Sequence, residues 1–251
     1  MASEPYQLIY YCGAPGRGEH IRLALEEAKA PYEDTASQGF EQCWKTVEAY
    51  LGDDFVGENG NTPYYAPPFF RHGDLFISQT SNILMYLGPR LGLAGRKGND
   101  IYRVNAFVLT ALDGLSNEVH DTHHPISHDV YWEDQKEESL RSSKEWVKTR
   151  LPKHLGYWEK VLANSKGPWL LGESFTYADI VLFQCLDGVQ FAFPKALNQA
   201  RESGKYNHVF ELCKAVAARP SIAAYLSSDK RQRYTLGIYR YYEQNDVVAE
   251  K

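Results

Sequence analysis

The sequence has few cysteines, no excess of positive charge and no long apolar run. Its 4 cysteines are widely scattered, with no Cys-x-x-Cys pair, so neither a disulfide framework nor a cysteine-based zinc site is expected. The formal net charge of -5 provides no general positive field for nucleic acid or anionic lipid. No segment approaches the roughly eighteen apolar residues of a membrane-spanning helix. We therefore expect neither nucleic acid nor a membrane as a partner.

Signals for export and for disorder are also missing. Residues 1–7 lack the basic and apolar stretches of a secretory signal, which together with reduced cysteines predicts a cytoplasmic location. Apolar residues make up 43% of the chain and charged residues 24%, as is ordinary for a folded globular protein. Most of the chain is expected to fold.

The first ninety or so residues have the element order of a small α/β protein. Apolar spacing and the positions of Gly and Pro predict strands at residues 7–11 and 31–34, a hairpin over residues 69–77, and helices at residues 19–30 and 78–87. The interval between the second strand and the hairpin is predicted to be rich in loops. The resulting order, β-α-β and then β-β-α, predicts one small sheet with helices packed on it.

After a linker at residues 88–98, nearly all of the chain has helical periodicity. The predicted helices cover residues 101–119, 133–163, 177–191 and 207–218. Thr176 and Asp179 form a capping box in front of an apolar run, and we interpret them as structural residues. The sequence thus predicts an α/β domain at residues 1–90 and an all-helical domain at residues 99–251.

Three segments resemble one family and follow one another in that family's order over almost the whole chain. Residues 11–23, which begin Tyr-Cys-Gly-Ala-Pro-Gly-Arg-Gly-Glu, are similar to the strand, loop and helix that open the alpha, mu, pi and sigma glutathione transferases. Residues 68–80 resemble the family's cis-proline, hairpin and Gln-Ser pair, with Thr80 in place of serine. Residues 167–172, followed by the capping box, resemble the family's C-terminal signature.

The resemblance implies a glutathione transferase fold and activity. It implies a thioredoxin-like N-terminal domain at residues 1–90 that binds glutathione, and an all-α C-terminal helical bundle at residues 99–251 that binds an apolar electrophilic acceptor. The implied enzyme is a transferase of the tyrosine type, of the kind used in detoxification, that conjugates the glutathione thiolate to this acceptor. Glutathione is then a co-substrate, no metal or redox cofactor is needed, and the protein is a homodimer.

The implied chemistry needs the glutathione thiol to ionise near neutral pH, although a free thiol has a pKa of roughly 8.5. A tyrosine hydroxyl stays protonated up to about pH 10 and can donate a hydrogen bond to the thiolate. Aligned without gaps, the resemblance assigns this role to Tyr11. Tyr10 takes the role if one residue is inserted in the loop, because its side chain points to the other face. Cys12 is a rival nucleophile of the omega type, but its spacing to Glu19 does not match that class, which favours a half-buried thiol.

Four residues that flank the predicted hairpin are assigned to glutathione, two just before it and two at the start of the helix that follows it. Gln79 and Thr80 begin a helix, where free backbone N–H groups and the helix dipole favour a carboxylate, and the resemblance implies the γ-glutamyl carboxylate; helix capping is the alternative. Pro68 resembles the family's cis-proline, and the residue before it pairs its backbone with the cysteinyl unit. That residue is Pro67, which has no N–H, so one of the two expected hydrogen bonds cannot form unless Pro67 is itself the cis residue.

Other residues of the implied site are matched more loosely. Trp44 and Lys45 fall where the family often places a tryptophan and a lysine around the glycine carboxylate, with packing against the sheet as the alternative for Trp44. Asp113 resembles an aspartate that reaches the γ-glutamyl amine of the neighbouring subunit, or else it is a helix-surface charge. Arg17 either adds positive potential near the sulfur, as in the alpha class, or forms a surface salt bridge to Glu19 or to another neighbouring residue.

A group of histidines lies in the predicted helical part. His120, His123 and His124 share one helical face, and His128 follows them. Such a group could bind a metal, but no nearby cysteine completes a site and the resemblance includes no metal there. We expect the group to line the acceptor pocket or the domain interface.

Two alternative functions fit the same residues. The thiolate could serve isomerisation, peroxide reduction or ether cleavage, since sigma-like members vary in this way. The protein could also be a non-catalytic ligand-binding or structural protein on this scaffold. Tyr11, Gln79 and Thr80 argue against the non-catalytic reading, and Pro67 argues for it.

Overall fold

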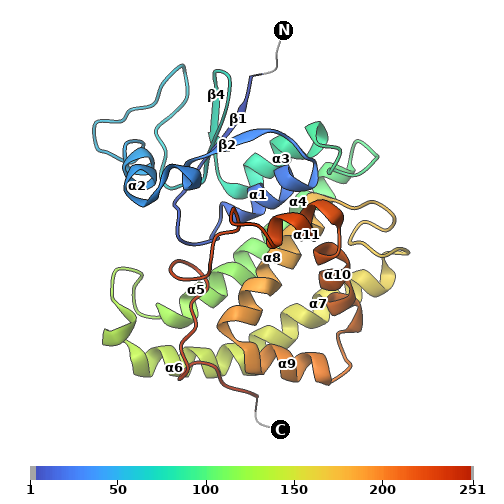
Figure 1. Cartoon of the computed structure of the whole chain (residues 1–251). Coiled ribbons are helices and arrows are strands. Elements are labelled where there is room, and N and C mark those ends of the chain that lie inside the picture. Colours follow the sequence, from blue (N-terminus) through green and yellow to red (C-terminus); the bar gives the residue numbers. More distant parts are fainter. Residues whose placement is uncertain (1–3, 250–251) are drawn as a thin grey trace. The chain divides into compact units, whose positions relative to one another are not determined.

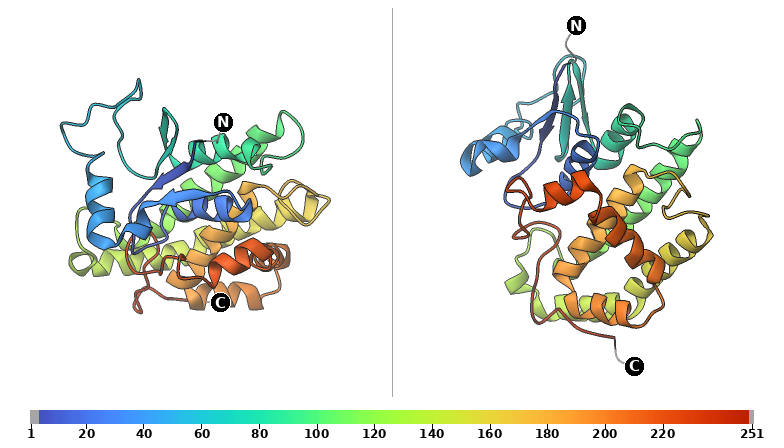
Figure 2. Two further views of the ribbon diagram at one scale, coloured as in Figure 1. Left: turned by 45° about the horizontal axis from the view of Figure 1, so that its top comes forward. Right: turned by 45° about the vertical axis from the view of Figure 1, so that its right-hand side comes forward.

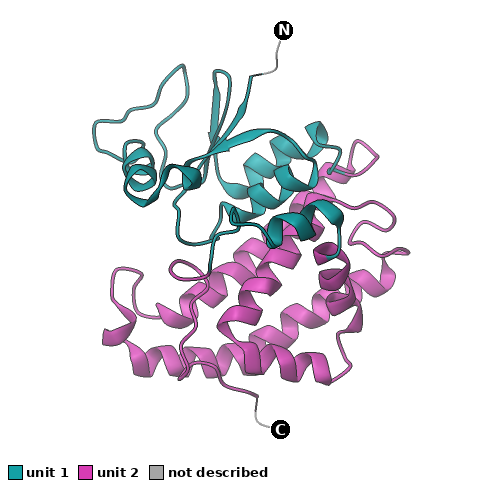
Figure 3. Cartoon of the chain, viewed as in Figure 1, with its two compact units in different colours: residues 1–94, 218–233 teal, residues 95–217, 234–251 magenta. Residues whose placement is uncertain are grey.

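The computed structural model describes residues 4–249, which form two compact units (Figure 3). Unit 1 combines Met1–Ala94 with Ala218–Arg233, and unit 2 combines Gly95–Ala217 with Tyr234–Lys251. Residues 1–3 and 250–251, which open and close the two predicted domains, lie outside the described residues. The domain limits at residues 1–90 and 99–251 stay a prediction.

Unit 1 is built on a four-stranded mixed sheet. Its strands are β1 (Tyr6–Ile9), β2 (Tyr32–Asp34), β3 (Phe69–His72) and β4 (Leu75–Ser78), in the spatial order β2-β1-β3-β4. β1 pairs parallel with β2 and antiparallel with β3, and β3 and β4 form the predicted hairpin. β1 ends two residues earlier than predicted. Its next residue, Tyr10, exchanges backbone hydrogen bonds with the Thr35 side chain, because the Tyr10 N–H donates to Oγ1 and the same hydroxyl donates to the Tyr10 carbonyl.

Helices cover both faces of this sheet. They are α1 (Glu19–Glu27), α2 (Phe40–Glu48), α3 (Thr80–Arg90) and α11 (Pro220–Leu226), preceded at α2 by a short 3-10 turn, Thr35–Gln38. Figure 2 (right) shows α2 on one side of the sheet and α1 and α3 on the other. The interval predicted to be rich in loops therefore contains a helix. α2 was missed because only Cys43 and Val47 of its side chains are buried, so its apolar stripe is too narrow to stand out.

Unit 2 is helical in its described part. Its helices are α4 (Asp100–Leu109), α5 (Asn117–His123), α6 (Lys136–Glu145), α7 (Leu151–Asn164), α8 (Tyr177–Ala192), α9 (Pro194–Glu202) and α10 (Asn207–Ala217). Wide π-helical turns at Thr110–Ser116 and Trp146–Arg150 join α4 to α5 and α6 to α7, which confirms long helical segments where they were predicted. α9 was not predicted. α8 is buried around most of its circumference and forms the centre of the unit (Figure 1).

The capping box at the start of α8 is confirmed. Thr176 is the N-cap residue, and its backbone N–H donates to the Asp179 carboxylate at 2.8 Å. The backbone N–H of Leu170 donates to the other oxygen of Asp179 at 2.8 Å, so one buried carboxylate fixes both the helix start and the preceding turn. Among the described residues no single helix is long and apolar enough to cross a membrane; only α8 and α9 taken together, bent by 115°, pass such a test by length and composition.

Candidate active site

Two adjacent tyrosines follow β1 and point to opposite faces of the sheet. Tyr11 packs against the apolar cluster of Ile9, Val47, Phe69 and Phe76, on the side of α2. Tyr10 lies beneath the loop that leads into α1. The alternation follows from the two-residue period of extended backbone, so the choice between the two tyrosines is a choice between two faces.

The Tyr10 side chain stabilises the loop between β1 and α1. Its hydroxyl accepts a hydrogen bond from the Arg17 backbone N–H at 2.9 Å. A Cβ added to Gly18 would lie 2.6 Å from the Tyr10 ring, and one on Gly16 would overlap the Tyr10 hydroxyl. The glycines of this loop are therefore needed to let the backbone pass over the ring. Burial raises the pKa of Tyr10, and its surroundings favour a structural role.

The Tyr11 side chain is only half-buried, and its hydroxyl makes no hydrogen bond to another described residue. Its ring lies 4.4 Å, centroid to centroid, from that of Trp44 on α2. Burial, and then the negative charge of Glu48, raise the pKa of Tyr11 above its usual value. The hydroxyl therefore stays protonated at neutral pH and is able to donate a hydrogen bond to an anion.

Trp44 brings an unsatisfied donor to the same place. Its indole Nε1 is buried and has no hydrogen-bond partner among the described residues. A buried donor of this kind normally has an acceptor, and a ligand carboxylate or carbonyl would supply one. The neighbouring Lys45 is exposed on α2. α2 thus presents an N–H donor beside Tyr11.

Cys12 is enclosed by its neighbours. The residue is 9% exposed, its thiol faces the Phe40 carbonyl at 3.8 Å, and its backbone N–H donates to Cys43 Sγ at 3.0 Å. Burial raises the pKa of Cys43 to about 12, which keeps that thiol protonated. A nucleophilic cysteine needs access and a stabilised thiolate, so this environment argues against Cys12 as the nucleophile.

The peptide bond between Pro67 and Pro68 is cis, as the sequence predicted for Pro68 and not for Pro67. Pro68 is buried and directly precedes β3, whereas Pro67 is half-buried. Pro67 offers a carbonyl oxygen but no N–H to a ligand. The loop before β3 therefore lacks the backbone N–H that a residue other than proline would offer to a ligand at position 67.

At the start of α3, one residue has a strained backbone and the next one uses its side chain in a hydrogen bond within the protein. Gln79, the N-cap residue, is exposed and has a φ of 71°, a conformation that costs a non-glycine residue roughly 1–3 kcal/mol and often marks a functional site. Thr80 is buried, and its hydroxyl donates to the Arg17 carbonyl at 3.3 Å. Tyr10 and Thr80 therefore hold the backbone of Arg17 from both sides. No side chain caps α3, so its first backbone N–H groups have no side-chain acceptor.

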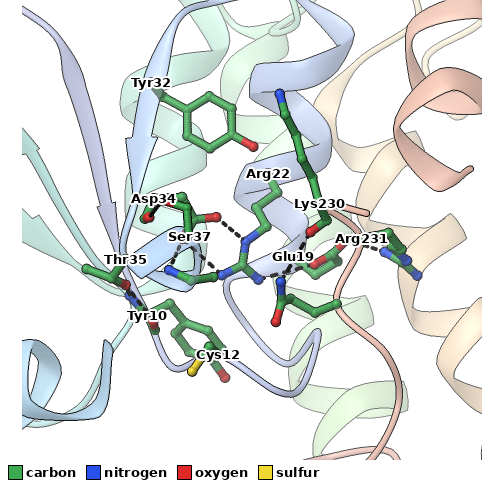
Figure 4. A network of polar contacts seen from close by, with 12 residues as sticks. Tyr10, Cys12, Glu19, Arg22, Tyr32, Asp34, Thr35, Ser37, Lys230 and Arg231 are labelled. Carbon is green, nitrogen blue, oxygen red and sulfur yellow. Dashed lines mark hydrogen bonds and ion pairs between the residues drawn. The ribbon is translucent and has the colours of Figure 1, made fainter. Parts of the chain in front are cut away.

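A buried ion-pair network at the start of α1, which the sequence analysis missed, supports this loop (Figure 4). Arg22 is fully buried and donates to Asp34 at 2.6 Å and to Glu19 at 3.2 Å. Glu19 also accepts from the Tyr225 hydroxyl at 2.7 Å and pairs with Arg231. Glu19 is therefore bound by Arg22, Tyr225 and Arg231. The only signal was the spacing of Glu19 and Arg22 by three residues, which does not distinguish buried pairs from exposed ones.

The remaining candidate residues lie in unit 2. Asp113 is exposed on the π-helical turn that follows α4. His120 and His123 belong to the last turn of α5, and His124 is its C-cap residue. The role of Asp113 in a neighbouring subunit's site stays a prediction.

Comparisons with known proteins agree with this architecture. A sequence profile described as "Glutathione S-transferase, C-terminal domain" matches residues 120–229. "Glutathione S-transferase P 1" of Xenopus laevis is 27% identical over 234 residues, covering 91% of this chain and 95% of the relative. "Glutathione S-transferase Mu 3" of Mus musculus is 27% identical over 219 residues, covering 83% and 87%.

Solved structures match the fold. A glutathione S-transferase from Ascaris lumbricoides superposes with a TM-score of 0.65 at 21% identity, covering 92% of this chain and 98% of that chain. The Pi-class enzyme of Onchocerca volvulus gives 0.62 at 21% identity, covering 88% and 91%. The fold class is thus the predicted one, a thioredoxin-like N-terminal part with a helical C-terminal part. These matches support a cytosolic glutathione S-transferase, and the curated relatives are named as such enzymes.

Proposed function

We propose that the protein conjugates the glutathione thiolate to electrophilic, partly apolar acceptors, with the Tyr11 hydroxyl donating a hydrogen bond to the sulfur. The observation that carries this proposal is the half-buried Tyr11, whose protonated hydroxyl has no hydrogen-bond partner among the described residues. Tyr10 is the weaker candidate because its hydroxyl already holds the Arg17 N–H. The names of the relatives from Xenopus laevis and Mus musculus support the reaction class.

The residues around Tyr11 suit the polar groups of glutathione, a tripeptide with two carboxylates. Trp44 and Lys45 offer an N–H donor and a positive charge to the glycine carboxylate. Gln79 and the backbone N–H of Thr80 offer a helix N-terminus to the γ-glutamyl carboxylate. The carbonyl of Pro67 offers an acceptor to the cysteinyl N–H, while Pro68 holds the loop in its cis form. The missing N–H of Pro67 leaves this part of glutathione with one hydrogen bond.

Two assays on the full chain test the reaction together. Retention on glutathione-agarose measures binding, and turnover of a generic aryl halide with glutathione measures conjugation. We expect both. Binding without turnover of the aryl halide, of a peroxide or of an isomerisable substrate would favour a non-catalytic binding protein and overturn the proposal. The cytoplasmic location remains part of the proposal and is supported by the four free cysteines.

The strained Gln79 gives a prediction with two separable parts. Gln79→Ala and Gln79→Gly should both raise the KM for glutathione more than they lower kcat, because the side chain contacts the γ-glutamyl end, far from the sulfur. Gln79→Gly should also be about 1 kcal/mol more stable than Gln79→Ala, because glycine adopts a φ of 71° without steric cost. Steady-state kinetics and urea unfolding measure the two effects.

Thr80→Ala is the comparison for that pair. It should raise KM and cost about 0.5–1.5 kcal/mol of stability, because the hydrogen bond to the Arg17 carbonyl is lost. An unchanged glutathione affinity in both Gln79→Ala and Thr80→Ala would refute the placement of the γ-glutamyl group.

A homodimer is part of the proposed function. Closed two-fold pairing is the commonest oligomeric state, and we expect sedimentation to give twice the 28.6 kDa chain mass. Asp113→Ala should weaken glutathione binding modestly without dissociating the dimer, because one charge-assisted contact to the neighbouring subunit's ligand is lost. A monomer at working concentration, or wild-type affinity in Asp113→Ala, would argue against a shared site.

A further inference from the structure

The histidines of α5 and the following loop form one compact cluster in unit 2. The ring centroids of His120 lie 5.0 Å from those of His123 and of His124, and the His123 and His124 rings lie 4.7 Å apart. One ring nitrogen of each of these three residues lies within 4.8 Å of the other two. The three side chains therefore converge on one point.

Two of the three rings have one nitrogen fixed by a backbone acceptor. His124 Nδ1 lies 3.1 Å from the Val130 carbonyl and donates to it, which leaves Nε2 with its lone pair. His123 is 2% exposed and bonds the Gly237 backbone, while its Nε2 is buried with no partner among the described residues. A histidine that ligates a metal is usually oriented in this way, with its second nitrogen donating to a carbonyl.

We propose that His120, His123 and His124 form a binding site for a divalent transition metal, Zn²⁺. Neutral imidazole nitrogens are ligands that Zn²⁺ prefers, and three protein ligands leave the fourth tetrahedral position to water or another group. A tetrahedral site with Zn–N bonds of about 2.0–2.1 Å places its ligand atoms roughly 3.4 Å apart. The ring nitrogens lie within 4.8 Å of one another, so metal binding would draw them closer together.

The surroundings of the cluster bear on the affinity. The C-terminal end of a helix carries partial negative charge and favours a cation, and His120 and His123 stand in the last turn of α5. Burial lowers the pKa of His123 to about 2, so this ring is neutral at physiological pH. Two charges lie nearby: Arg240, which disfavours a cation, and Asp121, which hydrogen-bonds to His128 at 3.2 Å.

A metal at this site would strengthen the attachment of residues 237–242 to α5. His123 bonds Gly237, its ring lies 5.9 Å from that of Tyr242, and Tyr242 stacks on Trp132 at 4.0 Å. A metal on Nε2 of His123 makes its other N–H a stronger donor to the Gly237 carbonyl. Metal binding should therefore raise the thermal midpoint of unfolding.

The test titrates the metal-free full-length protein with Zn²⁺ against a chromophoric chelator and with Co²⁺ as an absorbing substitute. We expect one equivalent per chain and an affinity at least about 10- to 100-fold weaker in His120→Gln and in His124→Gln. His208→Gln is the matched control, because His208 is exposed and pairs with Glu159 away from the cluster. Its affinity should equal that of the wild type. Circular dichroism confirms that each variant is folded.

A second triad distinguishes where the metal lies. His120, Asp121 and His128 also place ligand atoms within 4.8 Å of one another. If His120, His123 and His124 bind the metal, His128→Gln should leave the Zn²⁺ affinity within a few-fold of the wild type. Loss in His128→Gln with wild-type binding in His124→Gln, equal losses in His208→Gln, or no binding by the wild-type protein would each overturn the proposal.

Discussion

Tyr11→Phe is expected to slow glutathione conjugation at neutral pH by about 10- to 100-fold while leaving glutathione affinity largely intact. A hydrogen bond to a charged group contributes roughly 1.5–3 kcal/mol, which corresponds to about one to two pKa units of the bound thiol. The bound thiol should therefore ionise at higher pH in the variant, and the two rates should converge as the pH rises. Thiolate absorbance and the pH–rate profile measure this shift.

The matched controls are Tyr10→Phe and Cys12→Ser. Tyr10→Phe removes only the hydrogen bond from the Arg17 N–H, so it should keep the rate and cost about 0.5–1.5 kcal/mol of stability. Full activity in Tyr11→Phe with loss in Tyr10→Phe would place the catalytic hydroxyl on the other face of the sheet. Loss of most activity in Cys12→Ser would replace tyrosine chemistry with cysteine chemistry.

Arg22→Met is expected to destabilise the protein by about 3–5 kcal/mol, because it removes the guanidinium partner of Asp34 and leaves Glu19 with Arg231 as its remaining ion-pair partner. Urea unfolding at neutral pH measures the loss. The matched control is Arg103→Met, since Arg103 pairs with Asp100 at the same three-residue spacing but is 65% exposed in its side chain. We expect this control to cost no more than about 1 kcal/mol.

Local sequence patterns sufficed for the strands, the hairpin and the longest helices. The apolar spacing in β1, α1 and α8 is set by contacts made along most of each element, and therefore it appears in the sequence. α11 is different, because it is seven residues long and starts with Pro220 at its first turn. Too few residues carry its period to reveal it.

The candidate site could be predicted only in part. The two-residue alternation made it clear that Tyr10 and Tyr11 face opposite sides, but which side is open depends on the loop that packs on Tyr10 and on α2. The contact of Tyr11 with Trp44 requires α2, which the pattern did not show. The partners of Glu19 at Tyr225 and Arg231 are more than 200 positions away, beyond any local rule.

The composition of unit 1 bears on how the chain can fold during synthesis. Ion pairs and hydrogen bonds join α1 to residues after position 217: Glu27 to Arg219, Glu26 to Lys230, and Glu19 to Tyr225 and Arg231. The sheet and its first helices leave the ribosome more than a hundred residues before these partners do, although N-terminal domains commonly fold first. The ion-pair network around Glu19 and Arg22 therefore stays incomplete during synthesis until α4 to α10 have been made. A fragment that stops at Ala94 carries the same incomplete cluster permanently.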